Sequence, residues 1–489
     1  MKDTSKQLYF PQRKLKIEIQ MNTYDIIIVG GGPGGSVAAK VAAENGLNTI
    51  FFERGRKPGD KNSSGCGLGP RMFRDFPEMM KDLTPEKCPS MRAGTAARNY
   101  FVNKEDIVAG YIMARPTESV SYEPAKSWIT MNVYRSEFDP WIAKCATDAG
   151  AKLKTSTLIV DLLKEDGKVS GVIDDKGEKY KAPIIIGADG VVSTVAQKSG
   201  LRSKWTQKQV TLTLQYDFQA PPEKIDDIMG DETLAVWWGA NFPASYQVFF
   251  NDGFHQGLGN WMNWWDKNPL YYLNKVINLK YYQRLLKILE AKPREIQAHL
   301  LPWLDYPYNT HTDGIILIGD AGGFPCPLEA EGIYPAMVTG KIAAEVAAEA
   351  FSSGDYSKEF LKKFDEGWKK TSIGEEFEAG SELWNIWKAL PFNPKETMSW
   401  FVPMIMELLG GIFDWSQPHA KRVRQIVSQV KSYMPKATPF IMKNVFPLVA
   451  KIFEDDLDKI MDPKKIMTVL PKLLDMLPQK KKRRGDRDR

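Results

Sequence analysis

The 489-residue chain contains little cysteine and no long apolar run. Its four cysteines are scattered and form no C-x-x-C pair, so neither a disulfide framework nor a metal or iron–sulfur site is expected. The longest apolar candidate, residues 401–413, is interrupted by Pro403 and Glu407 and is shorter than the roughly 18 residues that span a bilayer. Residues 1–20 are charged and lack the apolar core of a signal peptide. These absences predict a cytoplasmic protein, and Met21 is a second candidate start.

Net positive charge is small outside the C-terminus. The last ten residues hold seven basic and two acidic side chains, so they account for five of the net six positive charges. A body this close to neutral is not that of a nucleic-acid binder, and no nucleic-acid partner is predicted. Hydrophobic residues make up 43% of the chain and charged residues 26%, which excludes wholesale disorder. The length predicts two or three domains.

One stretch, residues 24–53, combines a strand, a glycine turn, a helix, a second strand and an acid. The apolar runs 24–29 and 49–52 are strand-like, and the small residues 36–43 between them favour a helix. The turn has the sequence G-x-G-x-x-G, with its glycines at Gly30, Gly32 and Gly35. Such a turn lets backbone amides and a helix N-terminus approach a pyrophosphate, while a following acid accepts hydrogen bonds from a ribose. The pattern predicts a dinucleotide site, and Glu53 favours FAD or NAD over NADP because it would repel a 2′-phosphate.

Two later segments can each be interpreted in two ways. The glycine-dense loop 63–70, which contains Cys66, is either a surface loop or a wall against a flat cofactor. Arg135 opens a predicted helix that runs to about residue 149, and its side chain is either solvated or paired with a phosphate or carboxylate. The residues alone leave both alternatives open. A small β-meander is predicted over residues 151–180.

A second buried strand, residues 184–187, ends in Gly-Ala-Asp-Gly, and a third, residues 314–318, ends in Gly-Asp at Asp320. An alanine-rich helix follows the third strand and extends to about residue 351. A carboxylate at a strand end can bind a ribityl chain, and the positive end of a helix dipole can face a flavin ring. These segments, with the glycine turn, predict a discontinuous FAD domain.

The section between these segments, residues 206–308, has a different character. Four strand-like runs occur at 210–216, 234–238, 246–250 and 256–261, and aromatic residues are dense among them. A sheet of this composition needs aromatics for its own core, and it can also present an apolar wall to a ligand. Each aromatic fits either role, and as a group they favour a bulky apolar substrate.

These motifs are similar to those of FAD-dependent oxidoreductases related to p-hydroxybenzoate hydroxylase. More narrowly, the sequence resembles the geranylgeranyl reductase family over roughly residues 21–350. That family has a C-G-x-G loop beside the isoalloxazine, an R-x-x-F-D segment, and G-D-A-A-G followed by G-E-G-I. The corresponding segments here are Cys66-Gly67-Leu68-Gly69, Arg135-Ser136-Glu137-Phe138-Asp139, Gly319-Asp320-Ala321-Gly322-Gly323 and Glu331-Gly332-Ile333.

The resemblance implies a set of cofactor contacts and a reaction. Together with the glycine motif, the implied FAD contacts are Gly30, Gly32, Gly35, Glu53, Cys66, Gly67, Gly69, Arg135, Ile159, Asp320, Gly332 and Ile333. Members of the family hydrogenate isoprenoid double bonds, so a reduced flavin would deliver hydride to one alkene carbon. Cys66 or a flavin-bound water would protonate the other carbon. The sequence does not identify the electron donor, and the candidates are reduced ferredoxin, NAD(P)H and an F420-type carrier.

Two positions depart from the family pattern. Ala196 stands where many relatives have an arginine, which gives no support to a nicotinamide-nucleotide contact there. The family's Y-x-W-x-F-P segment is present only as residues 246–251, without the tryptophan and the proline. The flavin site is therefore better supported than the prenyl site.

The C-terminal region is rich in Met, Phe, Trp and Pro and contains amphipathic segments, such as 440–449 and 466–474, too short to span a bilayer. A basic tail follows, and each basic residue near an anionic leaflet adds on the order of 1 kcal/mol to binding. Peripheral attachment to a membrane surface is expected, because a lipid substrate requires access to the bilayer. A helical cap on the core is the alternative.

The predicted fold class is α/β, a Rossmann-like FAD-binding domain with an inserted antiparallel β-sheet substrate domain and a C-terminal helical region. The expected division is an N-terminal extension 1–20, FAD-binding parts 21–205 and 310–366, a substrate domain 206–309, a helical region 367–478 and a basic tail 479–489. The predicted activity is reduction of geranylgeranyl double bonds of membrane lipids. The alternatives are an electron-transfer-flavoprotein:quinone oxidoreductase-like protein, a flavin monooxygenase, and a flavin-binding membrane scaffold without turnover.

Overall fold

The computed structural model describes residues 22–60, 64, 66–102, 108–114, 130–239, 242–261, 266–327, 330–379, 432 and 435. The expected N-terminal extension, nearly all of the expected C-terminal helical region and the basic tail lie outside these residues. Loop residues 61–63 and 65 next to Cys66 lie outside them too.

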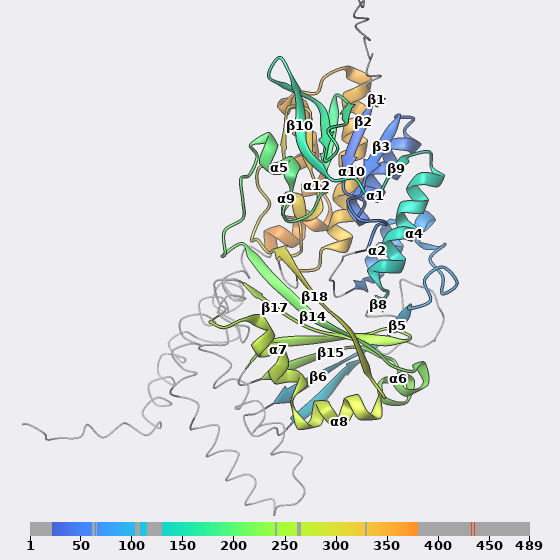
Figure 1. Cartoon of the computed structure of the whole chain (residues 1–489), viewed down its shortest axis with the longest axis vertical. Helices are drawn as coiled ribbons and strands as arrows, with labels where there is room; N and C mark the ends of the chain where they lie inside the picture. Colours follow the sequence, from blue (N-terminus) through green and yellow to red (C-terminus); the bar gives the residue numbers. More distant parts are fainter. Residues whose placement is uncertain are drawn as a thin grey trace, which may run out of the picture.

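A six-stranded sheet forms the centre of the upper body in Figure 1. Its strands are parallel except for β19, which pairs antiparallel with β20. The β-branched runs of the sequence form these strands because parallel strands are buried on both faces. In order across the sheet, the strands are β19 (His311–Thr312), β20 (Ile315–Leu317), β13 (Ile184–Gly187), β2 (Ile26–Val29), β3 (Thr49–Phe52) and β9 (Lys152–Lys154).

Three long helices cover one face of this sheet: α1 (Pro33–Glu44), α4 (Arg135–Asp148) and α10 (Ile333–Ser353). Helices α1 and α10 touch through their backbones, because a Cβ added at Gly340 would lie 2.3 Å from the carbonyl oxygen of Gly34. Shorter helices add to the same core, namely α2 (Pro70–Asp75), α3 (Pro77–Met80), α11 (Lys358–Leu361), α12 (Lys363–Lys369) and a further helix over 372–379.

A small four-stranded sheet and a short helix, α5 (Thr194–Ser199), cover the other face of the six-stranded sheet. The small sheet consists of β1 (Asn22–Thr23), β12 (Lys179–Lys181), β11 (Lys168–Asp174) and β10 (Ile159–Glu165). Strands β10, β11 and β12 pair antiparallel in sequence order, so the meander predicted from the turn signals is confirmed. The central sheet is therefore sandwiched between helices and a second sheet.

A seven-stranded sheet lies below this body in Figure 1. Its order is β18 (Lys292–Pro302), β14 (Val210–Gln219), β17 (Gly253–Trp261), β16 (Phe242–Phe249), β15 (Glu232–Gly239), β6 (Ala96–Val102) and β7 (Val108–Ala114). A three-stranded sheet of β4 (Gly67–Leu68), β8 (Thr130–Asn132) and β5 (Arg92–Gly94) connects the two bodies.

The sequence predicted that the second sheet is antiparallel, and this needs a correction. Strand β6 runs parallel to β15, and every other pair in the sheet is antiparallel. Strands β6 and β15 are far apart in the sequence, so no hairpin constrains their relative direction. In addition, β6 and β7 come from the segment 21–205, which the sequence assigned to the FAD-binding part.

The two faces of the seven-stranded sheet have different roles. One face packs on helices α6 (Pro222–Met229), α7 (Pro269–Ile277) and α8 (Lys280–Ile288), with Trp237, Phe249 and Phe254 fully buried there. The opposite face is directed toward the six-stranded sheet, and its Val248 packs with Cys66 and Tyr134. Successive side chains of a strand point to opposite faces. Trp237 therefore belongs to the core, and its neighbour Trp238 lies on the side of Cys66.

Candidate functional site

The glycine turn lies at the carboxyl end of β2, where the chain enters α1. Gly30 has φ +114°, and a Cβ there would lie 2.1 Å from the carbonyl oxygen of Ala188. A Cβ on Gly35 would lie 1.9 Å from the carbonyl oxygen of Gly30. By contrast, the nearest atom to a Cβ on Gly32 is Nη2 of Arg135, at 4.0 Å. Gly30 and Gly35 thus allow tight packing, whereas Gly32 borders open space in front of the helix.

Helix α1 begins at that open space without a side-chain cap, and Gly32 is its N-cap residue. The first amides of a helix need acceptors, and the helix dipole makes this end positive. A pyrophosphate supplies both the acceptor oxygens and the negative charge. The turn therefore fits the phosphates of a dinucleotide.

Glu53 follows β3, the strand next to the glycine turn. Its carboxylate accepts hydrogen bonds from the backbone N–H of Gly31 at 3.1 Å and of Gly55 at 2.6 Å. These bonds fix the carboxylate beside the turn and leave it oxygen lone pairs for a ribose. Ile159, at the start of β10, is different: its side chain is buried in the core of the opposite face of the sheet. Only the backbone near Ile159 lies beside this region, because the N–H of Thr157 donates to the carbonyl of Glu53 at 3.0 Å.

Arg135 is the first residue of α4, and its guanidinium lies on the site side of the helix. Nε and Nη2 donate to Oδ1 and Oδ2 of Asp139 at 2.5 and 2.7 Å, one turn further along. Burial opposes the charge of Arg135, but Asp139 outweighs it and raises the pKa of the guanidinium. Arg135 is therefore a fixed cation with 14% of its side chain exposed, and its charge opposes the rise in the pKa of Cys66 and of Asp320. Asp139 is four residues further along the helix, at the spacing of a helical ion pair, whereas the sequence analysis left a solvated arginine as the alternative.

Cys66 is buried, with 2% of its surface exposed, and it has φ +54°. Its N–H donates to Oγ of Ser64 at 3.1 Å, and its thiol donates to the carbonyl oxygen of Ser64 at 3.3 Å. Burial raises the pKa of the thiol to about 11, although the positive charge of Arg135 opposes the rise. The thiol is therefore protonated at neutral pH. Of the two alternatives for this loop, a surface loop is excluded at Cys66.

Residues after β20 and at the start of α10 complete the candidate site at this edge of the six-stranded sheet. Asp320 is in α9 (Gly319–Gly322), directly after β20, and burial raises the pKa of its carboxyl against the effects of His299 and Arg135. A Cβ on Gly332 would lie 3.4 Å from Oδ1 of Asp320, so the N-terminus of α10 begins beside this carboxyl. Ile333 is the first residue of α10 and is buried.

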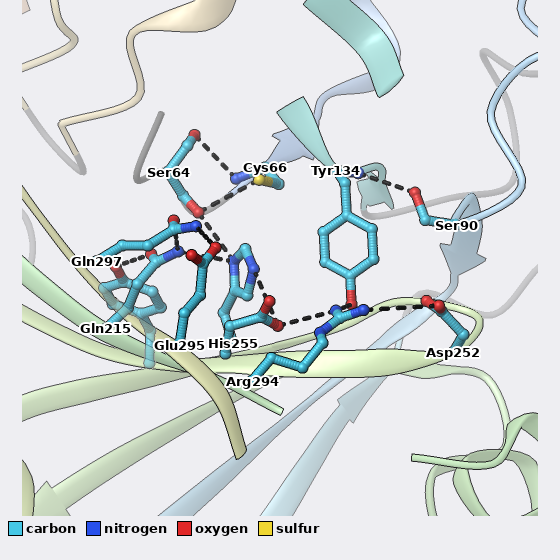
Figure 2. Close-up of polar contacts among 12 residues, drawn as sticks. Ser64, Cys66, Ser90, Tyr134, Gln215, Asp252, His255, Arg294, Glu295 and Gln297 are labelled. Atoms are coloured by element: carbon cyan, nitrogen blue, oxygen red, sulfur yellow. Dashed lines mark hydrogen bonds and ion pairs between the residues drawn. The ribbon is translucent and has the colours of Figure 1, made fainter. Parts of the chain in front are cut away.

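Next to Cys66, the facing side of the seven-stranded sheet carries a polar group that the sequence analysis did not identify (Figure 2). Its centre is His255 of β17, only 3% exposed, which lies directly across from Asp217 of β14. Arg294 of β18 pairs with Asp217 at 3.0 Å and also donates to the hydroxyl of Tyr134. No local sequence signal marks this group, because the pairing of distant strands brings these side chains together.

The burial of His255 predicts a pH dependence of stability. Burial lowers the pKa of His255 to about 4, below the roughly 6.5 of an unfolded chain. The neutral ring is therefore favoured by folding, and its contribution is complete above about pH 6.5 and decreases as the pH falls toward 4. Denaturant titrations should show that the wild type loses roughly 2 kcal/mol more than His255→Asn between pH 6.5 and pH 5. If the wild type and His255→Asn lose equal free energy of unfolding over this pH range, His255 is not the buried neutral group responsible.

The structure thus brings most of the sequence-predicted residues to one edge. The glycine turn and Glu53 lie at the ends of β2 and β3, Asp320 at the end of β20, and Arg135 between them and Cys66. Gly67 pairs with Asn132 across β4 and β8, and Gly69 is the N-cap of α2. The side chain of Ile159 is not at this edge. The open space at Gly32 and the uncapped helix fit an FAD molecule.

Comparisons with known proteins agree with this geometry. The family model described as FAD binding domain matches residues 23–268. Digeranylgeranylglycerophospholipid reductase 2 of Methanothermobacter thermautotrophicus is 30% identical over 368 residues, covering 73% of this chain and 85% of that protein. The digeranylgeranylglycerophospholipid reductase of Methanocaldococcus jannaschii is 28% identical, covering 71% of this chain and 83% of that protein.

Solved structures with low sequence identity share the fold. A geranylgeranyl bacteriochlorophyll reductase-like protein from Thermoplasma acidophilum has a TM-score of 0.66 and 22% identity, covering 86% of this chain and all of that one. The halogenase PltM, crystallised with phloroglucinol and FAD, has a TM-score of 0.55 and 15% identity, covering 84% of this chain and 96% of that one. The resemblance inferred from the sequence motifs is confirmed. This chain belongs to the geranylgeranyl reductase family of FAD-dependent oxidoreductases.

Proposed function

We propose that this protein uses FAD to saturate carbon–carbon double bonds in the geranylgeranyl chains of membrane lipids. The observation that carries the proposal is an apolar wall on the seven-stranded sheet, next to Cys66. The relatives are named as reductases of digeranylgeranylglycerophospholipids, a substrate class whose chains an apolar wall would accommodate. We infer that the FAD contacts are the residues gathered at the edge of the six-stranded sheet and on the Cys66 loop.

The wall extends across four strands. On β15, Leu234 and Val236 lie opposite Val248 and Tyr246 of β16, and Leu234, Tyr246 and Val248 pack around Cys66. Further along the same face, Trp238 stacks on Phe101 of β6, which stacks in turn on Tyr111 of β7. Neighbouring strands are about 4.8 Å apart, so the wall from β16 to β7 is roughly 15 Å wide. This width suits several isoprene units of an extended chain.

The residues of the site have distinct roles in the proposed reaction. Reduced FAD, when bound, supplies the hydride that one alkene carbon receives. Cys66 holds a proton at Sγ, because burial raises the pKa of the thiol to about 11, and it is the proposed donor to the other carbon. An unactivated alkene has no carbonyl to polarise, so the wall must position the chain closely and exclude water.

We also propose the division into FAD-binding parts 21–205 and 310–366 and a substrate domain 206–309, with β6 and β7 added to the substrate sheet. The C-terminal segments 367–478 and 479–489 are proposed to attach peripherally to the membrane that contains the lipid. Within the part of the chain that the structure describes, no helix combines the length and apolar character needed to cross a bilayer.

An anaerobic experiment tests the function. Purified holoenzyme is reduced with dithionite and mixed with a digeranylgeranylglycerophospholipid, with the fully saturated lipid as control. We expect reoxidation of the flavin only with the unsaturated lipid, and a mass gain of two for each reduced bond. Reoxidation by a quinone with the lipid unchanged would favour the quinone oxidoreductase, and oxygen consumption coupled to substrate would favour a monooxygenase.

Two adjacent tryptophans provide a test of the wall. Trp237 is fully buried against the helices, so Trp237→Ala should lower the free energy of unfolding by roughly 3–5 kcal/mol. Trp238 lies on the proposed substrate face, is half-buried and donates from Nε1 to Oδ1 of Asn99 at 3.1 Å, so Trp238→Ala should cost about 2 kcal/mol but raise the lipid KM about tenfold. Denaturant titration and steady-state kinetics measure the two effects. Equal KM values for wild type and Trp238→Ala would contradict a substrate role for this face.

A further inference from the structure

The segment that contains Cys66 depends on contacts from outside itself. Its positive φ is a conformation that a non-glycine residue rarely adopts, so neighbouring groups must stabilise it. On one side, the carbonyl of Cys66 accepts the N–H of Val133 at 3.1 Å, next to the pairing of β4 with β8. On the other side, both polar groups of Ser64 contact Cys66. The position of the thiol therefore depends on what holds Ser64.

The contact that holds Ser64 comes from the sheet below it. Nδ1 of His255 lies 3.2 Å from the carbonyl oxygen of Ser64, the same oxygen that accepts the thiol of Cys66. Figure 2 shows the imidazole standing on β17 and pointing up at this carbonyl. A carbonyl oxygen only accepts, so the bond requires a proton on Nδ1.

Polar groups from two neighbouring strands surround the ring of His255. On β14, Oδ1 of Asp217 lies 3.6 Å from Nε2, and Nε2 of Gln215 lies 3.1 Å from Nδ1. On β18, Arg294 pairs with Asp217. The charge of Arg294 lowers the pKa of the His255 ring, and the charge of Glu295 raises it. On β16, the directly opposed residue is the apolar Val248. Gln215 and Ser64 compete for Nδ1, because the Gln215 amide nitrogen donates and the carbonyl accepts.

We propose that His255 is a positioning residue for Cys66: by donating its Nδ1–H to the Ser64 carbonyl, it fixes the cysteine thiol at the junction of the two bodies. The inference extends the proposed function, in which Cys66 supplies a proton. Asp217 and Arg294 lie on the sheet side of the imidazole, where Nε2 carries no proton in this tautomer and so makes no hydrogen bond to the Asp217 carboxylate. Loss of the Nδ1–H should therefore free the segment without removing any group that would contact FAD or lipid.

Three variants of His255 separate this role from a merely structural one. Asparagine places an amide nitrogen near the position of Nδ1, glutamine places it near Nε2, and leucine has no donor. The reporter is the alkylation of Cys66 by iodoacetamide, measured by peptide mass spectrometry on the holoenzyme. The half-buried Cys145 is replaced by serine in all proteins, and Cys88, which is fully buried, reports global opening.

We expect Cys66 to be alkylated about tenfold faster in His255→Leu and His255→Gln than in the wild type, because one hydrogen bond to a buried group is lost. His255→Asn should remain within about threefold of the wild type. The rate at Cys88 should not change in any variant. Equal rates at Cys66 in the Asn and Leu variants would overturn the proposal, as would parallel increases at Cys66 and Cys88.

The assay needs no lipid, so its outcome is independent of the proposed function. If the wild type fails to reduce the lipid but Cys66 responds as expected, the positioning role stands and the substrate assignment fails. If the lipid is reduced and the alkylation rates are unchanged, only the positioning role fails. As a kinetic readout, His255→Leu should lower kcat about tenfold, with rescue by asparagine.

Discussion

Replacing Gly32 with valine is expected to abolish FAD binding while the apoprotein stays folded. No atom lies closer than 4.0 Å to a Cβ at this position, so the side chain meets no protein neighbour. It would instead occupy the space in front of α1, where the pyrophosphate must approach the backbone. We expect the affinity for FAD to fall by about 100-fold or more, since overpacking of this size costs roughly 1–3 kcal/mol and contacts with the amides are lost as well. Titration of apoprotein with FAD, followed by flavin fluorescence, measures the effect.

Two further variants make the Gly32 result specific. Gly35→Ala places a Cβ 1.9 Å from a backbone oxygen, so it should lower the stability of the apoprotein itself. Glu44→Gln, at the far end of the same helix, removes only a salt bridge with Lys40 and should change neither FAD binding nor stability beyond about 0.5 kcal/mol. If Gly32→Val binds FAD like the wild type, the cofactor does not lie against this turn.

Replacing Cys66 with alanine is expected to lower turnover about 100-fold while the protein keeps its full FAD content. A positioned general acid contributes roughly 100- to 10,000-fold to a rate, and the thiol is protonated at neutral pH because burial raises its pKa to about 11. Alanine preserves the backbone and removes only Sγ, so the cofactor contacts should persist. Lipid reduction is measured by mass spectrometry under anaerobic conditions, with flavin content from absorbance.

Cys145→Ser is the matched control for the Cys66 prediction. Cys145 is in α4 and is only half-buried, and its substitution should leave turnover within about twofold of the wild type. Full turnover in Cys66→Ala with normal flavin content would remove the thiol from the mechanism. The proton would then come from another source, such as a water beside the flavin.

The parts that could be predicted from the sequence are those determined by neighbouring residues. The unit from β2 to Glu53 is of this kind, because one turn, one helix and one strand fix its geometry. The loop at Cys66 is not: whether it is exposed depends on β16 packing against it, and Val248 is remote in sequence. Arg135 could be predicted in part. Its partner Asp139 is only four residues away, but other elements of the fold shield its side chain from solvent.

The seven-stranded sheet shows more clearly that contacts between residues remote in the sequence could not be predicted. Four strand-like runs were recognised and β18 was missed, and the sequence could not determine which face each aromatic occupies, because that depends on strand order. His255 and Asp217 meet through the register of β14 with β17, and β6 joins β15 across a long stretch of sequence. Pairings of this kind are set by tertiary packing, which a local pattern does not contain.

The alternation along β15 has a consequence for how the enzyme could change. A deletion of one residue at the start of this strand would turn Trp237 to the proposed substrate face and Trp238 to the core. We therefore expect insertions and deletions to be tolerated in the loops and not in this strand, whereas point substitutions at Leu234, Val236 and Trp238 change only the opposite face. If this face binds the lipid as proposed, substitutions at alternate positions of one strand should alter the accepted chain length without a compensating change in the helices beneath.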